Sequence, residues 1–458
     1  MPNDARLLYR FNADVLSVKR EGDRVTIDVK DWRPIAFTTP KPAYADAVMA
    51  LEGEGASLER LDEIARASGD PAEAGEAVRY YLERFARGRL LGWKVLDGEG
   101  ELARADALAS RYLPKQDAPP AEDLQLCRFA FLHRVEEGAV LESGLARVRA
   151  VLTPHGLKTF VDCLASPRPA AEDGFSEALW RFGFFDVGQP EESGPRRCWE
   201  FHDLLMHESS RSNRDAVVVG GTYRFDGVFP SLPAKKPTMD GERIALPEVD
   251  TDRVRQSSRP LDEVQAARHS LRDYAEEPIS VSALGDFLWR VCRTTEYIED
   301  SRQDLISRPY PAGGSINELE FYLAVRRCGG LEPAVYHYDS HSHALVRLPG
   351  TEKVAEKIVE RSASAMGLDG DRQRPDLTVV IASRLSRLAW KYEGMAYRAS
   401  LMNAGGVFDL MYLVATDMGL APCANGTGDS RLLEESTGLD PFEETAIAEF
   451  VLGVPAAT

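Results

Sequence analysis

The sequence predicts a chain of mixed helices and strands, with two small helix-and-hairpin units ahead of a larger C-terminal half. A length of 458 residues is enough for two to four domains, each with its own core. Stretches with period-two alternation are interleaved with stretches of helical spacing. A segment rich in Pro, Ala and Asp, residues 111–123, separates two successive segments that have a similar order of elements.

The first segment, predicted as a domain over residues 1–115, begins with strands and continues with helices. Residues 15–18 and 25–29 alternate in the manner of strands joined by a polar turn. Residues 44–65 and 78–85 then repeat apolar side chains at three- and four-residue steps, and Ser57 marks a helix start. Residues 90–100 have the pattern of a hairpin. Helix, helix and hairpin is the order of a winged-helix module.

A second winged-helix-like domain, with its connector, is predicted over residues 120–250. Helical spacing covers residues 145–182, a wing-like stretch follows at 184–199, and a Gly- and Pro-rich connector runs from 199 to 250. Winged helices often bind DNA through basic helices. In the candidate helices of the first segment, acidic side chains such as Glu59, Glu63 and Glu76 outnumber the arginines, so we expect binding of a peptide or protein in preference to DNA. Residues 251–458 form the third predicted domain.

Composition excludes several classes of protein. A formal net charge of -18 argues against sequence-independent nucleic-acid binding. No apolar run reaches the length of a membrane span, and the N-terminus lacks the pattern of a secretory signal, so we expect cytoplasmic residence. The 6 cysteines contain no C-x-x-C pair, and the histidines, including His202 and His207, lack the spacing of a metal site. We therefore predict no metal and reduced, mostly buried thiols.

The dipeptide Lys391-Tyr392 is the candidate for catalysis. It follows residues 377–382, an apolar, β-branched run with the length of a buried strand. A lysine beside a phenol at the end of a buried strand can remove and relay a proton when burial favours the neutral amine. From the dipeptide alone, a solvent-facing lysine beside a half-buried tyrosine is the alternative.

Three further motifs have the composition of a cofactor site. In R-H-S-L-R, the groups of Arg268, Ser270 and Arg272 on one expected helical face suit a phosphate, although a solvated helix start has the same pattern. A glycine-containing loop lets the backbone approach a flat ring closely. This loop consists of Pro311, Ala312, Gly313, Gly314 and Ser315. A second such element follows an expected helix from Asn403 to Met418, and consists of Asn425, Gly426, Thr427 and Gly428.

Taken in order, these motifs resemble the nitroreductase superfamily. More narrowly, the C-terminal half is similar to the SagB/McbC-type azoline dehydrogenases, which include the cyanobactin thiazoline/oxazoline oxidases. The motifs are R-H-S-L-R, R-P-Y-P-A-G-G-S, K-Y, N-A-G-G, C-A-N-G-T-G-D and the closing E-F-V-L-G-V-P, with W-E-F-H-D-L-L-M-H-E-S-S-R and G-G-T-Y-R-F in the connector. The resemblance covers residues 199–458. The N-terminal part matches only in architecture, since these oxidases can carry tandem winged-helix peptide-clamp domains.

The resemblance implies an α+β fold, with an antiparallel-rich sheet flanked by helices, and an FMN-dependent oxidoreductase. It would oxidise thiazoline or oxazoline rings of a ribosomally made precursor peptide to thiazoles or oxazoles, with reoxidation by oxygen. Lys391 and Tyr392 would abstract the proton. Arg268, Ser270 and Arg272 would contact the phosphate and ribityl chain, the loop 311–315 the flavin ring, with Asn403 and the loop 425–428 as further contacts. A homodimer, the azoline-containing precursor peptide and the cyclodehydratase of the same pathway are the implied partners.

Two other functions compete with this interpretation. A general NAD(P)H-dependent flavin reductase for nitro compounds or quinones would leave the N-terminal domains and the Lys-Tyr pair without a purpose. A non-catalytic peptide-binding scaffold would bind no FMN, whereas R-x-S-x-R and A-G-G-S are intact. Asp409 stands where an amide is expected in many relatives, and residues 361–374 have the composition of a lid or a surface loop.

Overall fold

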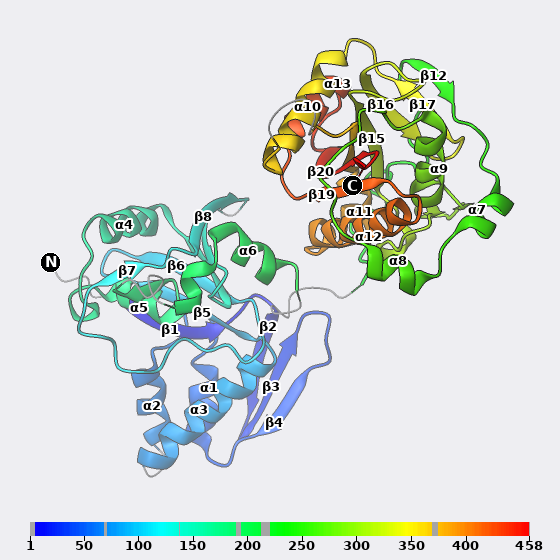
Figure 1. Ribbon diagram of the computed structural model, residues 1–458. Helices are drawn as coiled ribbons and strands as arrows, with labels where there is room; N and C mark the ends of the chain where they lie inside the picture. The colour runs from blue at the N-terminus through cyan, green and yellow to red at the C-terminus, as the bar shows by residue number, and fades with distance from the viewer. Residues whose placement is uncertain are drawn as a thin grey trace. The chain divides into compact units, whose positions relative to one another are not determined.

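The computed structural model divides the chain into two compact units, Met1–Val218 and Val219–Thr458, which are described separately (Figure 1). The structure describes residues 5–67, 71–136, 138–188, 194–211, 220–368 and 374–457. Unit boundaries thus differ from the predicted domain limits 1–115, 120–250 and 251–458. Within the described ranges, no helix is both long enough and apolar enough to cross a membrane.

The first unit contains a six-stranded antiparallel sheet in the order β1-β5-β6-β10-β9-β8, a three-stranded sheet β2-β3-β4 and the pair β11-β7. Its strands are β1 (Arg6–Phe11), β2 (Val15–Glu21), β3 (Arg24–Val29), β4 (Ile35–Thr38), β5 (Leu91–Leu96), β6 (Glu101–Ala107), β7 (Leu124–Leu126), β8 (Ala130–Val135), β9 (Gly138–Ser143), β10 (Val148–Leu152) and β11 (Phe185–Val187). Its helices are α1 (Pro42–Met49), α2 (Leu58–Arg66), α3 (Pro71–Arg87), α4 (Pro154–Ala165), α5 (Gly174–Phe182) and α6 (Phe201–Ser209).

The order of elements predicted for the first segment is confirmed. Ser57 begins α2 by accepting a hydrogen bond from the backbone N–H of Arg60. Helices α1 to α3 precede the hairpin of β5 and β6. In the second segment, the wing predicted over 184–199 is not formed in the described residues, because β11 pairs with the distant strand β7. The winged-helix classification of both segments stays a prediction.

One sheet and one core join the two segments that were predicted as separate domains. Strand β6 of the first segment pairs with β10 of the second over Val148↔Ala107 to Leu152↔Ala103. The buried Trp93 ring packs edge-on against Tyr9 and Tyr112 of the first segment and Phe182 of the second. Since apolar burial is the main favourable contribution to folding, this shared core makes residues from both segments one folding unit.

The second unit is built on a seven-stranded sheet in the order β12-β17-β16-β15-β18-β20-β19, and every pair in it is antiparallel. Its strands are β12 (Glu242–Ala245), β15 (Leu319–Val325), β16 (Ala334–Asp339), β17 (Ala344–Arg347), β18 (Leu377–Ser383), β19 (Ala421–Asn425) and β20 (Thr445–Gly453), with a separate pair β13 (Glu296–Ile298) and β14 (Leu305–Ser307). Its helices are α7 (Thr251–Ser257), α8 (Leu261–Ala267), α9 (Val281–Cys292), α10 (Glu352–Ala365), α11 (Leu385–Lys391), α12 (Ala396–Asp417) and α13 (Ser430–Thr437).

Helices cover both faces of this sheet. Successive side chains of a strand point to opposite faces, so Phe321 and Leu323 of β15 pack with α9 and α12, whereas Tyr322 and Ala324 pack with α10 and α13. Every residue of β15 and β18 is buried. The predicted strand at 377–382 and the predicted arrangement of an antiparallel sheet flanked by helices are therefore confirmed.

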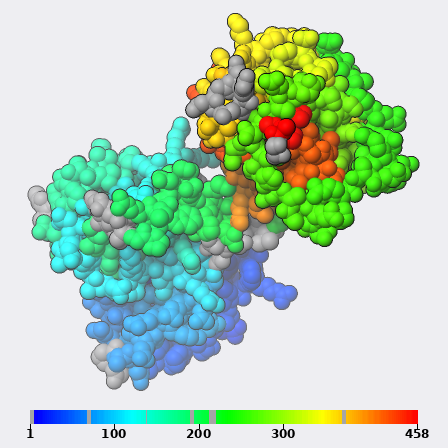
Figure 2. All heavy atoms as spheres, viewed as in Figure 1, coloured from blue at the N-terminus to red at the C-terminus, as the bar shows by residue number. Residues whose placement is uncertain are grey.

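The C-terminal end of the chain closes the second unit. Tyr274 forms a β-bridge with Pro455, and the backbone N–H of Ala456 donates to the carbonyl of Asp273. In Figure 2 the red C-terminal residues lie on the surface of this unit among the green ones. The segment that begins with R-H-S-L-R is thereby held at the β19 side of the sheet.

We expect Gly156→Ala to destabilise the first unit. A methyl group at Gly156 in α4 would overlap the backbone carbonyl of Leu102 in β6, whose carbon would lie 2.6 Å away. Such overpacking lowers the free energy of unfolding by about 1–3 kcal/mol. Thermal unfolding of the full chain, followed by calorimetry, measures the effect.

Gly75→Ala in α3 is the matched control, because no atom lies within 4 Å of the added methyl. Replacing a helical glycine by alanine should raise the free energy of unfolding by about 0.5–1 kcal/mol. Equal midpoints for the two variants would contradict the close packing of α4 on β6.

Candidate active site

Lys391 and Tyr392 lie at the end of the short helix α11. The prediction that the pair directly follows a buried strand is wrong, because β18 ends at Ser383 and α11 intervenes. Lys391 is the last residue of α11, and Tyr392 is its C-cap. Both side chains are half-buried. The pair is therefore held by a helix end and by the contacts of its neighbours.

The glycine loop 311–315 contacts this pair directly. The Nζ of Lys391 donates to the carbonyl of Gly314 at 3.4 Å. Gly314 has a φ of 61°, in the left-handed region that favours glycine. A methyl group there would overlap the Tyr392 hydroxyl and lie 2.8 Å from the Lys391 Nζ. Two motifs about eighty residues apart in the chain thus meet at a position where only glycine fits without strain.

Lys391 lies among aromatic rings. Its Nζ is 5.7 Å from the ring centroid of Tyr223 and 5.4 Å from that of Tyr392. In the part of the chain that the structure describes, no carboxylate forms an ion pair with it. An amine without a carboxylate partner remains available to a ligand, because no counter-ion holds it in place.

The predicted connector is part of this site. The backbone N–H of Thr222 donates to the carbonyl of Lys391 at 2.8 Å. Further along, the indole N–H of Trp390 donates to Phe229 O at 2.9 Å, and the guanidinium of Arg387 donates to Leu232 O. Arg387 is fully buried, and burial lowers its pKa to about 10. Residues 220–236 therefore pack on α11, which sequence reasoning missed because these contacts use backbone carbonyls.

Asn403 holds the glycine loop in place. Its Oδ1 accepts a hydrogen bond from the backbone N–H of Gly313 at 3.2 Å, and its Nδ2 donates to both carboxylate oxygens of Glu318 at 3.1 Å. Glu318 is fully buried and also accepts from the Ser400 hydroxyl at 2.9 Å. The amide of Asn403 is thus occupied by the protein. Glu318 and Ser400 were not predicted, since no motif distinguishes them.

The R-H-S-L-R segment is not helical, contrary to the prediction. Helix α8 ends before Arg268, which is extended with φ -61° and ψ 122°. The Ser270 hydroxyl lies 2.7 Å from the Tyr412 hydroxyl, and Arg268 lies 5.2 Å from the centroid of the same ring. Arg268 and Arg272 are exposed, and neither pairs with a carboxylate among the described residues. Two such guanidinium groups beside a hydroxyl suit an anionic group.

The loop 425–428 lies beside that segment. The Tyr412 hydroxyl accepts the backbone N–H of Ala424 at 2.8 Å, which joins β19 to the Ser270 contact. The Asn425 amide donates to Glu449 at 2.8 Å, and the Thr427 hydroxyl donates to Asn425 Oδ1 at 3.0 Å. These side chains are satisfied within the protein. Gly426 has no atom within 4 Å of an added methyl, so its backbone remains open to a ligand.

The predicted site residues therefore form two groups on helix α12. Asn403 belongs to the group of Lys391, Tyr392 and loop 311–315, and Tyr412 belongs to the group of Ser270 and loop 425–428. Nine residues separate Asn403 from Tyr412, which corresponds to about 13 Å along the helix and half a turn around it.

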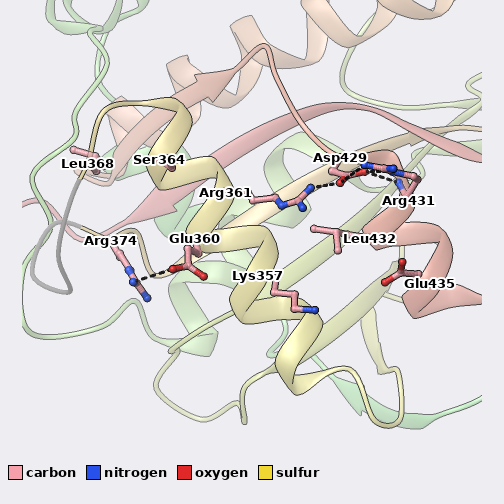
Figure 3. Close-up of a pocket in the computed structure, with 10 residues that line it drawn as sticks. All are labelled: Lys357, Glu360, Arg361, Ser364, Leu368, Arg374, Asp429, Arg431, Leu432 and Glu435. Atoms are coloured by element: carbon pink, nitrogen blue, oxygen red, sulfur yellow. Dashed lines mark hydrogen bonds and ion pairs between the residues drawn. The ribbon is translucent and has the colours of Figure 1, made fainter.

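A cavity of about 730 Å³ lies beyond loop 425–428, between α10 and α13 (Figure 3). Arg361 and Arg431 both reach Asp429 there, and Arg374 pairs with Glu360 at 3.3 Å. The hydrogen bond from Arg431 and that from Arg361 hold the pKa of Asp429 at about 2. The three arginines that line this cavity are therefore already paired with carboxylates. Of the predicted lid at 361–374, residues 361–365 belong to α10, and 369–373 lie outside the described residues.

In the described ranges no group of three His, Cys, Asp or Glu side chains has the arrangement of a metal site. All 6 cysteines are free thiols, and Cys198 is exposed while the other five are buried. Asp409, where an amide was expected, is exposed on α12.

Comparison with known proteins identifies the larger part of the second unit. Residues 266–453 match the Nitroreductase family model. The second unit holds a Nitroreductase family domain. The chain is 26% identical over 187 residues to MJ1384 of Methanocaldococcus jannaschii, a protein that is named as a nitroreductase. This match covers 41% of this chain and 85% of that protein.

Two further likenesses are to a second curated protein and to a solved structure. The chain is 27% identical over 150 residues to the trifolitoxin-processing protein TfxB of Rhizobium leguminosarum bv. trifolii, covering 32% of this chain but only 39% of that relative. Among solved structures, it is similar to a chain of the E. coli microcin synthetase McbBCD complex with truncated pro-MccB17 bound, at 17% identity and a TM-score of 0.35, covering 59% of this chain and 99% of that chain.

Gly314→Ala tests the contact between the loop and the pair. We expect it to lower the free energy of unfolding by about 2 kcal/mol more than Gly350→Ala does, as overpacking adds to backbone strain. Gly350 has a similar φ of 72° but no atom within 4 Å of the added methyl. Chemical denaturation of the full chain measures the difference.

A double-mutant cycle makes this test specific. Tyr392→Phe removes the hydroxyl that the methyl would overlap, so the extra cost of Gly314→Ala should fall by about 1 kcal/mol in that background. Additive effects of the two substitutions would contradict the contact.

Proposed function

We propose that the second unit is an FMN-dependent oxidoreductase that oxidises thiazoline or oxazoline rings in a precursor peptide to thiazoles or oxazoles. The observation that carries this proposal is the contact of Lys391 and Tyr392 with the glycine loop, within a Nitroreductase family domain. The family match supports FMN as the cofactor, and the likeness to TfxB supports a peptide as the substrate.

The residues present fit an FMN molecule. At Gly313 an added methyl would meet only the Ala399 side chain, at 3.9 Å, and at Gly426 it would meet no atom within 4 Å, so both stretches of backbone leave room for a ligand. Arg268 and Arg272 would hold the phosphate charge, and Ser270 would donate or accept a hydrogen bond beside them. Loop 311–315 would bind the ring, with Asn403 fixing the loop through Gly313.

The reaction requires a base close to the substrate ring. Aromatising an azoline removes two hydrogens from neighbouring ring atoms, one as a proton and one as a hydride. Bound FMN would supply the hydride acceptor. Lys391, in its neutral form, takes the proton, and the Tyr392 hydroxyl beside it relays or stabilises the charge.

A homodimer is part of the proposal. The two groups of site residues contact α12 on different sides, and a second copy that packs on this helix would bring its own residues close to both groups. The exposed surface of α12 includes Tyr397 and Met402, which are 44% and 65% exposed. Exposed apolar side chains on a helix of this length support an interface.

The first unit is proposed to bind the precursor peptide, in agreement with winged-helix-like peptide-clamp domains. Strand β8 is an edge of its six-stranded sheet, and Leu132 on it is 43% exposed. An open strand edge can accept an extended peptide through backbone hydrogen bonds. The cyclodehydratase that makes the azoline is a further proposed partner.

Lys391→Ala and Tyr392→Phe test the assignment of the base. Each variant should retain FMN but lose azole formation by a factor of about 100 or more, because general base catalysis contributes a factor of this size. The measurement is the rate at which a peptide with one thiazoline loses two hydrogens, followed by mass spectrometry.

Lys353→Ala, an exposed lysine of α10, is the control and should retain the rate. Full activity in both the Lys391 and Tyr392 variants would show that the pair is structural. If reduction by NAD(P)H proceeds and azoline oxidation does not, the protein is a general flavin reductase instead.

A further inference from the structure

A second cleft, which we call the connector cleft, has Trp390, the neighbour of Lys391 in the chain, in its lining. It has a volume of about 460 Å³. It is lined by residues 226–233 of the connector, residues 300–304 and Trp390. None of the predicted motifs falls in this lining, so the proposed reaction does not explain the cleft.

The connector side of the cleft carries exposed apolar side chains. Val228 is 72% exposed and Phe229 is 49% exposed. The ring centroids of Phe225 and Phe229 lie 4.7 Å apart. The backbone carbonyl of Phe229 accepts a hydrogen bond from the Trp390 indole N–H. This apolar surface is thus presented by an ordered backbone, which is typical of a surface that binds a partner molecule.

The cleft also carries acidic side chains. Three carboxylates, Asp226, Asp300 and Asp304, line it together with the single cation Arg302. Arg302 pairs with Asp226 at 3.5 Å. The remaining two carboxylates give the cleft a net negative charge, which favours a cationic occupant.

A buried amide in the lining has an unused acceptor. Gln303 is only 4% exposed, and its Nε2 donates to the Ser231 hydroxyl at 2.7 Å and to Arg387 O at 2.9 Å. Its Oε1 is buried and has no donor among the described residues. Rotating the amide would put this oxygen against the Arg387 carbonyl, so the orientation is fixed. The amide therefore joins residues 300–304 to Ser231 and to α11.

One aromatic ring separates the cleft from the candidate base. The Arg302 guanidinium lies 5.0 Å from the centroid of the Tyr223 ring, and the Lys391 Nζ lies 5.7 Å from the same centroid. Tyr223 also packs edge-on against Trp390. A peptide that reached from Lys391 into the cleft would span about 10 Å, or roughly three residues of extended chain.

We propose that the connector cleft binds a Lys or Arg side chain of the substrate peptide, about three residues from the ring that is oxidised. The apolar wall of Val228 and Phe229 contacts the aliphatic part of that side chain, and Asp300 and Asp304 attract its charge. This specificity site rests on the proposed function, because it assumes that the peptide's ring lies at Lys391.

Binding of synthetic peptides to the full chain tests this proposal without requiring turnover. Two heptapeptides carry a central thiazole, already aromatic, with Lys or Glu three residues from the ring and glycine elsewhere. Calorimetry should give a dissociation constant at least about fivefold lower for the Lys peptide at low salt, where charge interactions are least screened. The double variant Asp300→Asn/Asp304→Asn should reduce this preference to less than about twofold.

Asp252→Asn is the control, because Asp252 is an exposed carboxylate of the same unit but lies on α7 outside the cleft. It should leave the preference unchanged. Val228→Ser, at an exposed position, should weaken both peptides and keep their ratio, which provides a second test should the double variant fold poorly. Equal affinities in the unsubstituted protein, or an unchanged preference in the double variant, would overturn the proposal.

The corresponding thiazoline peptides separate this inference from the proposed reaction. A binding preference for Lys without any oxidation would support the cleft and contradict the proposed function. Oxidation of both peptides at equal efficiency, with equal affinities, would support the function and contradict the cleft.

Discussion

The buried carboxylate of Glu318 is the constraint on which the candidate site depends. Removing a carboxylate from water is costly unless hydrogen bonds replace the lost hydration. Ser400 and Asn403 of α12 donate hydrogen bonds to the Glu318 carboxylate. The backbone carbonyl of Glu318 accepts a hydrogen bond from the backbone N–H of Arg384 at 3.0 Å. Glu318 therefore joins α12 to the start of α11. Since Asn403 also holds Gly313, the loop and the Lys-Tyr pair are positioned by one network.

Helix α12 then sets the distance between the two parts of the site. Asn403 of this helix is hydrogen-bonded to Gly313 of the glycine loop. Tyr412, nine positions further along and on another side of the helix, is hydrogen-bonded to Ser270 and to Ala424, directly before loop 425–428. The connector adds a third set of contacts through the carbonyls of Leu232 and Phe229. These contacts fix the two groups of site residues at two separate places on one helix.

Strong periodicity allowed the sequence to predict the elements that form the sheet. The apolar run at 377–382 became β18, and helical spacing after Asn403 marked α12, because both are buried segments with clear patterns. Helix α11 was missed, since its buried side chains include Arg387, and a buried arginine looks like a surface residue in a hydropathy pattern. The grouping of site residues also needed the structure, because the contact of Gly314 with Tyr392 is a long-range one. The first unit's shared sheet depends likewise on the pairing of β6 with β10.

Azoline oxidation by bound FMN can be tested with an anaerobic visible spectrum of the purified protein. The spectrum is recorded before and after addition of a thiazoline peptide. If the protein oxidises azolines with FMN, we expect a flavin spectrum that bleaches on addition of the peptide in the absence of any nicotinamide. A flavin that bleaches only with NADPH, or a protein that binds no flavin, would contradict it.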